Sequence, residues 1–152
     1  MQRLQPTEAA APSSGSVLTL RLPNVLAAVE TARLAMHRHL DPLCLPSRLI
    51  YRLELVLEES VMNRVWHAHP EGGQHWFDFE VQILPAAIQM RFIDDGRPFD
   101  PLSRPEPPRP QSLDEARPGG LGLLLTRKSV SSAVYERTAD QNVLTLSFDR
   151  TA

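Results

Sequence analysis

Hydrophobic and polar residues alternate along several stretches of the chain with the two-residue period of β-strands. The first stretch covers residues 16–23, and two more, 75–84 and 87–94, are separated only by a short turn at Pro85. Residues 132–150 carry the same alternation on both sides of a short polar turn, which predicts two further strands. The pattern therefore predicts five strands, of which the last four form two hairpins.

Two other stretches have the spacing of amphipathic helices. The first helix is expected to run from Asn24, a residue type that caps helix N-termini, to about His39, and the second from about Ser47 to about Ala68. A third helix is expected over residues 120–131, which open on glycines. This order of elements predicts an α+β two-layer sandwich, in which a mixed, mostly antiparallel sheet is covered on one face by about three helices.

Two segments show neither period. Residues 1–15 contain almost no large apolar group, so they are expected to form a flexible N-terminal tail that cannot offset the entropy lost on ordering. Residues 96–120 are rich in proline, which interrupts helices and central strands. Long loops of this kind within a compact domain are usually functional or disordered. The rest of the chain, about residues 16–150, is expected to form one domain.

Composition narrows the class of protein. The apolar fraction of 42% and the charged fraction of 22% are ordinary for a globular domain, and the net charge of −2 offers no basic surface for nucleic acid. The apolar runs are too short to span a bilayer, and the N-terminus has no secretion-signal pattern. We therefore expect a cytoplasmic protein that binds neither nucleic acid nor membranes. The single cysteine, Cys44, is expected to be a small buried residue.

The stretch LEESVMNRVWHAH (57–69) places a carboxylate beside an amide on the second predicted helix. At about 100° per residue, Asn63 lies within a quarter-turn of Glu59, on the side opposite an apolar stripe. The stripe consists of Leu53, Leu57, Val61 and Val65. Apolar side chains also flank the polar pair, which indicates the wall of a partly apolar cleft; they are Leu55, Met62 and Trp66. Pairs of this spacing are common on surface helices as well, so the spacing alone does not establish a site.

Two further motifs have the chemistry of ligand sites. In IDDGRPFDP (93–101) an acid at a strand end could accept a hydrogen bond from a base amine, and the following glycine lets the chain turn close to a ligand. Asp-Gly is also a common turn dipeptide. In PGGLGLLLTRK (118–128), three glycines precede an apolar helix, where backbone amides can approach phosphate oxygens. No Gly-x-x-x-x-Gly-Lys phosphate loop is present.

Taken in order, these motifs resemble the ATP-binding fold shared by gyrase, histidine kinases and MutL, known as the Bergerat fold of the GHKL superfamily. The resemblance covers about residues 16–150 and is greatest to the small anti-sigma-factor serine/threonine kinases of bacteria. It implies that Glu59 is the general base, that Asn63 coordinates Mg²⁺, and that Asp94 with Gly96 reads the adenine of ATP. It also implies a nucleotide lid over residues 97–118. The phosphates of ATP would be held by Gly119, Gly120, Leu121 and Gly122.

The resemblance further implies a kinase that phosphorylates a serine or threonine of a STAS-type anti-sigma antagonist and sequesters a sigma factor. Relatives are commonly homodimers. The chain departs from the family at Pro98, which replaces the second glycine of Asp-x-Gly-x-Gly and would stiffen the lid hinge. An alternative stays open, in which the protein binds its partners without phosphorylating them. His67 and His69 suggest a metal site, but no carboxylate or cysteine completes the set, so structural or surface roles are expected.

Overall fold

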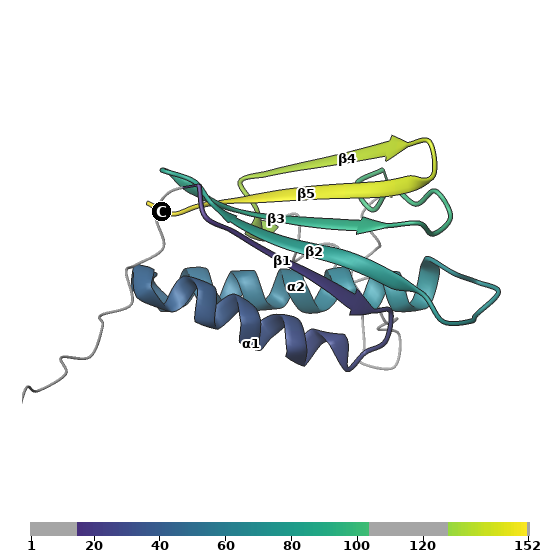
Figure 1. The fold of residues 1–152 in the computed structure, drawn as a ribbon. Helices are drawn as coiled ribbons and strands as arrows, with labels where there is room; N and C mark the ends of the chain where they lie inside the picture. Colours follow the sequence, from purple (N-terminus) through teal and green to yellow (C-terminus); the bar gives the residue numbers. More distant parts are fainter. Residues whose placement is uncertain (1–14, 104–127, 152) are drawn as a thin grey trace, which may run out of the picture.

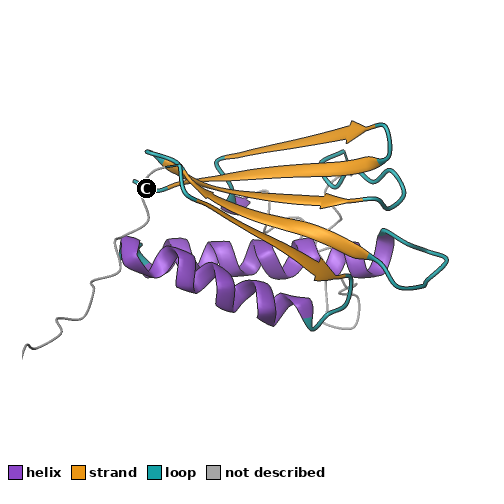
Figure 2. Cartoon of the chain, viewed as in Figure 1, coloured by secondary structure: helices purple, strands orange, loops and turns teal. Residues whose placement is uncertain are grey.

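The computed structural model describes residues 15–103 and 128–151. One five-stranded sheet has the strand order β1-β2-β3-β5-β4, and all its neighbouring strands are antiparallel. The strands are β1 (Val17–Pro23), β2 (Trp76–Ile83), β3 (Ala87–Asp94), β4 (Ser132–Thr138) and β5 (Gln141–Asp149). The helices are α1 (Ala28–Leu40), the single 3₁₀ turn η1 (Asp41–Leu43) and α2 (Ser47–His67). Helices α1 and α2 lie side by side under one face of the sheet (Figures 1 and 2).

The predicted α+β two-layer sandwich is confirmed. The strand predictions agree with the structure to within about two residues, and α2 has nearly its predicted bounds. The third predicted helix lies mostly outside the described residues, as do residues 1–14 of the predicted tail and residues 104–118 of the predicted lid. In the described chain the helical segments are therefore α1 and α2 with η1 between them, and residues 128–129 at the end of the third predicted helix.

The predicted N-cap of the first helix is wrong. Helix α1 begins at Ala28, and its N-cap position is Ala27, whose side chain makes no capping hydrogen bond. The side-chain amide of Asn24 instead donates to the backbone carbonyl of Arg64 at 3.1 Å. Asn24 therefore ties the entry to α1 to the neighbouring helix, a role that depends on α2 and is not visible in the local sequence.

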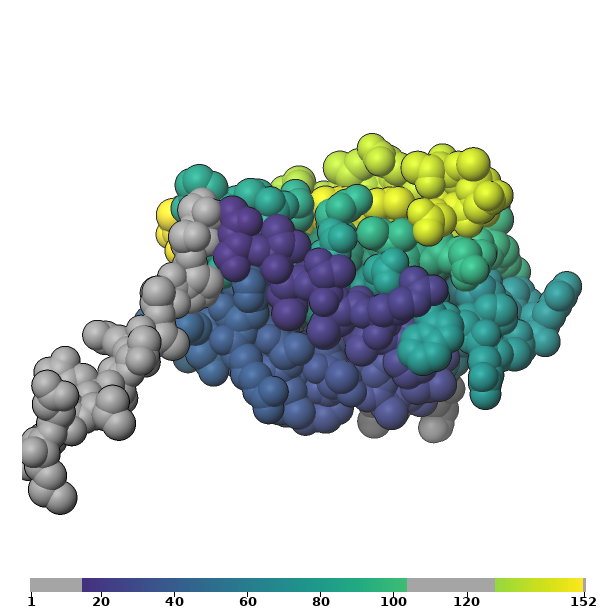
Figure 3. All heavy atoms as spheres, in the orientation of Figure 1, coloured from purple at the N-terminus to yellow at the C-terminus, as the bar shows by residue number. Residues whose placement is uncertain are grey.

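A single apolar core fills the space between the two layers. The alternation along β2 and β3 places one face of each strand inward, and α1 and α2 contribute their apolar stripes. Fully buried members include Met36, Leu53, Leu57, Phe79 and Phe92. Burial of each such side chain contributes about 1.5–3 kcal/mol relative to exposure, so this packing supplies most of the driving force for folding. In the space-filling view, β1 and α1 form a continuous surface along one side (Figure 3).

The structure also bears on two predictions made from composition, the burial of Cys44 and the lack of a membrane-spanning segment. Cys44 is exposed, not buried as predicted, and it follows the turn η1 at the surface with a left-handed backbone (φ 49°). None of the helices in the described part of the chain has the length and apolar character needed to cross a membrane.

Candidate functional site

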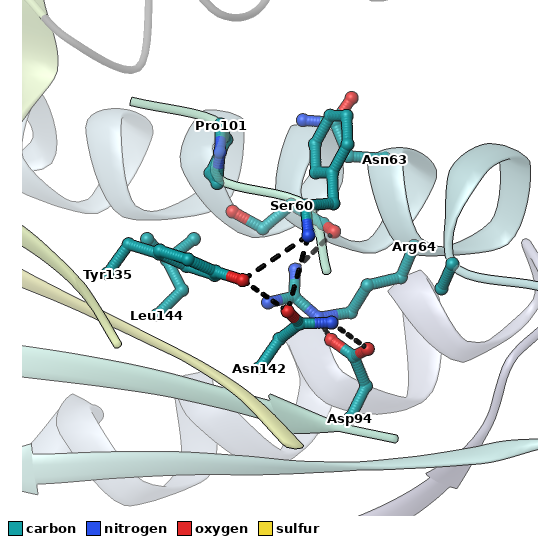
Figure 4. A pocket seen from close by; sticks show the side chains of 10 residues that line it. Ser60, Asn63, Arg64, Asp94, Pro101, Tyr135, Asn142 and Leu144 are labelled. Atoms are coloured by element: carbon teal, nitrogen blue, oxygen red, sulfur yellow. Dashed lines mark hydrogen bonds and ion pairs between the residues drawn. The ribbon is translucent and has the colours of Figure 1, made fainter. Parts of the chain in front are cut away.

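A small cavity lies where the C-terminal half of α2 faces the ends of the central strands (Figure 4). Its volume is about 30 Å³, which is space for one or two water molecules. Small-molecule sites commonly measure about 300–1,000 Å³, so no nucleotide base fits here without movement of side chains. The lining includes Asn63 and Arg64 from α2, Asp94 from β3, Tyr135 from β4 and Asn142 from β5.

An ion pair between α2 and β3 closes the inner end of the cavity. Nε of Arg64 lies 3.1 Å from Oδ2 of Asp94, and the two residues are only 8% and 6% exposed. Nη1 of Arg64 donates to the backbone carbonyl of Ser60 at 2.8 Å, and the guanidinium stacks 4.6 Å from the ring centre of Phe92. Burial lowers the pKa of Arg64 to about 10 and the carboxylate of Asp94 opposes that shift, so the guanidinium is charged at neutral pH.

The second oxygen of the Asp94 carboxylate is held by two other donors. Oδ1 accepts hydrogen bonds from the backbone N–H of Gly96 at 3.0 Å and from the side-chain amide of Asn142 at 2.9 Å. Asn142 can reach this oxygen because it pairs directly opposite Asp94 in the antiparallel register of β3 and β5. The orientation of the carboxylate is therefore fixed by its own turn and by the neighbouring strand.

The start of the predicted lid is attached to the sheet through Asn142. The amide nitrogen of Asn142 also donates to the carbonyl of Arg97 at 2.9 Å, and its oxygen accepts from the hydroxyl of Tyr135 and from the backbone N–H of Phe99. Nη1 of Arg137 donates to the carbonyl of Gly96 at 2.8 Å. Residues 96–99 thus follow a fixed path over the ends of β4 and β5.

Gly96 permits a close approach between the Asp-x-Gly turn and the end of α2. A Cβ atom at this position would lie 2.6 Å from the backbone oxygen of Ala68, which is a steric clash. The next residue strengthens the contact, since the backbone N–H of Arg97 donates to the same oxygen at 2.9 Å. The structure therefore explains the glycine by packing against α2, while its predicted contact with adenine stays a prediction.

Glu59 and Asn63 lie on one side of α2, as the helical spacing predicted, and both are half-buried. Asn63 lines the cavity, and Glu59 lies one turn away along the helix. Oε1 of Glu59 is buried and has no hydrogen-bond partner among the described residues. Burial raises the pKa of the Glu59 carboxyl, and the neighbouring charge of Glu58 raises it further. An uncompensated acid oxygen at such a position suits a ligand or substrate that supplies the missing partner.

Asn63 has the chemistry of a Mg²⁺ ligand. Mg²⁺ is bound by oxygen ligands, usually one or two from the protein with the rest from water and phosphate. The amide oxygen of Asn63, which lines the cavity, offers such a ligand. The residues present therefore fit this ion. The phosphate-binding set predicted at Gly119, Gly120, Leu121 and Gly122 lies outside the described residues.

Sequence analysis missed Arg64, although the sequence contains a signal. At about 100° per residue, Arg64 falls on the apolar stripe of the second helix, between Leu53 and Leu57. A charged residue on the buried face of an amphipathic helix requires a partner of opposite charge. Asn142 and Tyr135 have no comparable signal, because only the strand register brings them to the site.

A second polar cluster lies beside the cavity, in the loop after α2. The structure brings His75 and Asp95 to His69, so a carboxylate is present that the sequence did not suggest. The two imidazole rings are stacked at 3.4 Å between centroids and are parallel to within 4°. Since the nitrogen lone pairs lie in the ring planes, parallel stacked rings cannot direct them at one ion, and this arrangement does not fit a metal site. Burial and the adjacent His75 lower the pKa of His69.

Comparisons with known proteins agree with the fold and identify the family. Residues 22–148 match the family model described as the histidine kinase-like ATPase domain. Over 100 residues, which are 66% of this chain and 70% of the relative, the chain is 33% identical to the serine/threonine-protein kinase BtrW of Bordetella bronchiseptica. The fold is similar to the crystal structure of the RsbU and RsbW domains of Rv1364c from Mycobacterium tuberculosis, with a TM-score of 0.61 and 17% identity over 88% of this chain. That chain is longer, and the present one covers 32% of it.

Proposed function

Because the chain belongs to the histidine kinase-like ATPase domain family, we propose that it binds ATP with Mg²⁺ and transfers the γ-phosphoryl group to a serine or threonine of another protein. The observation that carries the proposal is the half-buried Glu59 carboxyl, whose buried Oε1 has no hydrogen-bond partner in the described chain and which lies one helical turn from the cavity-lining Asn63. The relative named as a serine/threonine-protein kinase supports the reaction class.

Each residue of the site has a distinct task in this proposal. Asn63 holds Mg²⁺, which when bound neutralises the charge on the transferred phosphoryl group. Asp94 accepts a hydrogen bond from the exocyclic amine of adenine. Glu59 accepts the proton of the attacking serine or threonine hydroxyl. The oxygen of that hydroxyl bonds to the γ-phosphorus while the bond between the γ-phosphorus and the ADP oxygen breaks. A raised pKa suits this role, because a base works best when its pKa lies near the working pH.

For the protein partners, we propose a STAS-type anti-sigma antagonist as the substrate, whose phosphorylation releases this chain to capture a sigma factor. The resemblance of the ordered motifs to the anti-sigma-factor kinases supports the choice of partners, and the relative named as a serine/threonine-protein kinase supports a protein as substrate. We further propose that the protein acts as a homodimer, as its relatives commonly do. These partners define the assay, because the kinase activity is measured on a STAS-domain protein captured by pull-down from the native cell.

A second candidate function is partner binding without phosphoryl transfer. It is favoured by the small volume of the cavity and by the ion pair that already engages Asp94. Pro98 supports it as well, because proline stiffens the segment at which a lid would hinge.

The two candidates are separated by changing Glu59. Glu59→Gln should retain ATP affinity but lower the rate of phosphoryl transfer by about a hundredfold or more, the effect of removing a positioned general base. Asn63→Ala should impair both affinity and transfer, since it removes the metal ligand. Glu58→Gln is the matched control, because Glu58 is the exposed neighbour of Glu59. If wild type and Glu59→Gln both bind the captured partner but leave it unphosphorylated, the kinase proposal fails and the binding module stands.

A further inference from the structure

We propose that Arg64 is an internal competitor for the nucleotide base: its guanidinium occupies the Asp94 carboxylate, and an adenine amine reaches that carboxylate only when Arg64 leaves. The inference rests on the proposed function, in which Asp94 reads adenine. It adds a residue that sets the affinity of the site, and it follows from the contacts of Arg64 in the structure (Figure 4).

Hydrogen bonds use the acceptor sites of one oxygen of Asp94, and Arg64 covers the other oxygen. A carboxylate has about four lone-pair sites, two on each oxygen. On Oδ1 both are taken, one by the backbone N–H of Gly96 and one by the amide of Asn142. Oδ2 faces Nε of Arg64 at 3.1 Å in an ion pair without a hydrogen bond of good geometry, and the whole aspartate is only 6% exposed. The oxygen that an adenine amine would need is therefore the one that Arg64 holds.

The small volume of the cavity agrees with the position of Arg64 beside the Asp94 carboxylate. Arg64 lines the cavity, whose volume of about 30 Å³ is roughly a tenth of the smallest common ligand site. The guanidinium is planar and presents N–H donors along one edge, as the amine edge of adenine does. It stacks on Phe92, so it also occupies an apolar surface beside the carboxylate. In this conformation Arg64 fills the place where a base would meet Asp94.

The need to displace Arg64 lowers the affinity of the wild-type protein for a nucleotide. A ligand that binds only a minor conformation has an apparent dissociation constant equal to the intrinsic value divided by the fraction of that conformation. Opening requires the loss of the contacts of Arg64 with Asp94, Ser60 and Phe92. The wild-type protein should therefore bind ATP weakly, and removal of the guanidinium should strengthen binding.

The test compares Arg64→Met with wild type by calorimetry using Mg-ATP. Methionine keeps the apolar stem but removes the donors, so the affinity should rise by about tenfold or more. Arg48→Met is the matched control, because Arg48 is exposed on the same helix, and it should bind as wild type does. If wild type binds ATP and Arg64→Met binds equally or more weakly, the competitor role is overturned. If folded wild type and folded Arg64→Met both fail to bind, nucleotide binding itself fails, and the competitor role fails with it.

A second measurement uses the wild-type protein, because removing one partner of a buried ion pair strongly destabilises a fold. In nuclear magnetic resonance the Nε–H of Arg64 should be protected from solvent exchange in the free protein and lose that protection when Mg-ATP saturates the site. Protection that persists in the saturated protein would overturn the inference. A wild-type preference for GTP that Arg64→Met loses would also overturn it, because Arg64 would then remain in place and read O6 and N7 of guanine.

Discussion

The two halves of the interface between α2 and the sheet differ in what holds them together. The N-terminal half packs aliphatic side chains such as Leu49, Leu53 and Val56 into the apolar core. The C-terminal half presents Arg64 to Asp94 across the same two layers. Apolar packing stabilises in proportion to the area buried, whereas a buried ion pair must first offset the desolvation of both charges.

This difference indicates that the two halves of the interface between α2 and the sheet have different roles. Replacing a buried ion pair by well-packed apolar residues is often neutral or stabilising, so the pair is poor support for a purely structural role. The unpartnered oxygen of Glu59 lies in the same half and is likewise unfavourable for stability. Groups that weaken the fold gather at the end of α2 where we propose nucleotide binding, and the other end provides the stability that permits them.

The largest expected effect comes from breaking the ion pair on one side. Asp94→Ala should lower the free energy of unfolding by about 3–5 kcal/mol, because it leaves the charge of Arg64 buried without a partner. Urea unfolding measures this directly. Asp95→Ala is the control, since Asp95 is exposed and its loss should change stability by less than about 0.5 kcal/mol. Equal losses in the two variants would show that the pair is not buried as described.

Truncation in the apolar half should cost almost as much stability but leave the site intact. Leu53 is fully buried, so Leu53→Ala should lower the free energy of unfolding by about 2–5 kcal/mol through lost burial and a residual cavity. Nucleotide affinity, measured well below the unfolding midpoint, should be unchanged. Leu34→Ala on the exposed side of α1 should have a much smaller effect on stability. A large change in affinity for Leu53→Ala would contradict the separation of the two halves.

A smaller effect is expected at the periphery of the polar half. The hydroxyl of Tyr135 donates to Asn142, so Tyr135→Phe should cost about 0.5–1.5 kcal/mol, the usual net value of one hydrogen bond. Amide exchange of Phe99 should become faster in this variant, because its N–H donates to the Tyr135 hydroxyl and to the Asn142 side chain. Unchanged exchange would indicate that the segment is fixed by other contacts.

The smallest effect concerns Glu59 and depends on pH. Its pKa is raised above the ordinary value of 4.5, so the unfolded chain ionises first as the pH rises. The folded state therefore loses stability as the pH rises above about 4.5, and this loss is complete once the folded carboxyl is also ionised. Glu59→Gln should gain about 0.5 kcal/mol at pH 7 and little at pH 4, measured by urea unfolding. Glu58→Gln should gain less, because the charge of Glu58 is the smaller of the two causes that raise the pKa of Glu59, and an equal gain there would contradict the prediction.

The sequence predicted most of the fold because the relevant signals are local. The two-residue alternation located β1, β2 and β3, and the helical spacing gave α2 nearly its observed bounds. It also placed Glu59 and Asn63 side by side, since the distance between residues four apart on a helix is fixed by the helix itself. The errors, an N-cap at Asn24 and a buried Cys44, arose where the neighbouring element decides the environment of a residue.

The sequence by itself determined the strands, the helices and the carboxylate and amide of α2, because these follow from the periods of the chain and from local geometry. Only the tertiary structure decided what surrounds Asp94. Asn142 lies 48 positions away in the sequence and meets Asp94 through the register of β3 and β5, while Arg64 meets it through the packing of α2 on the sheet. Contacts of this kind depend on how separate elements are placed against one another, which no local pattern encodes.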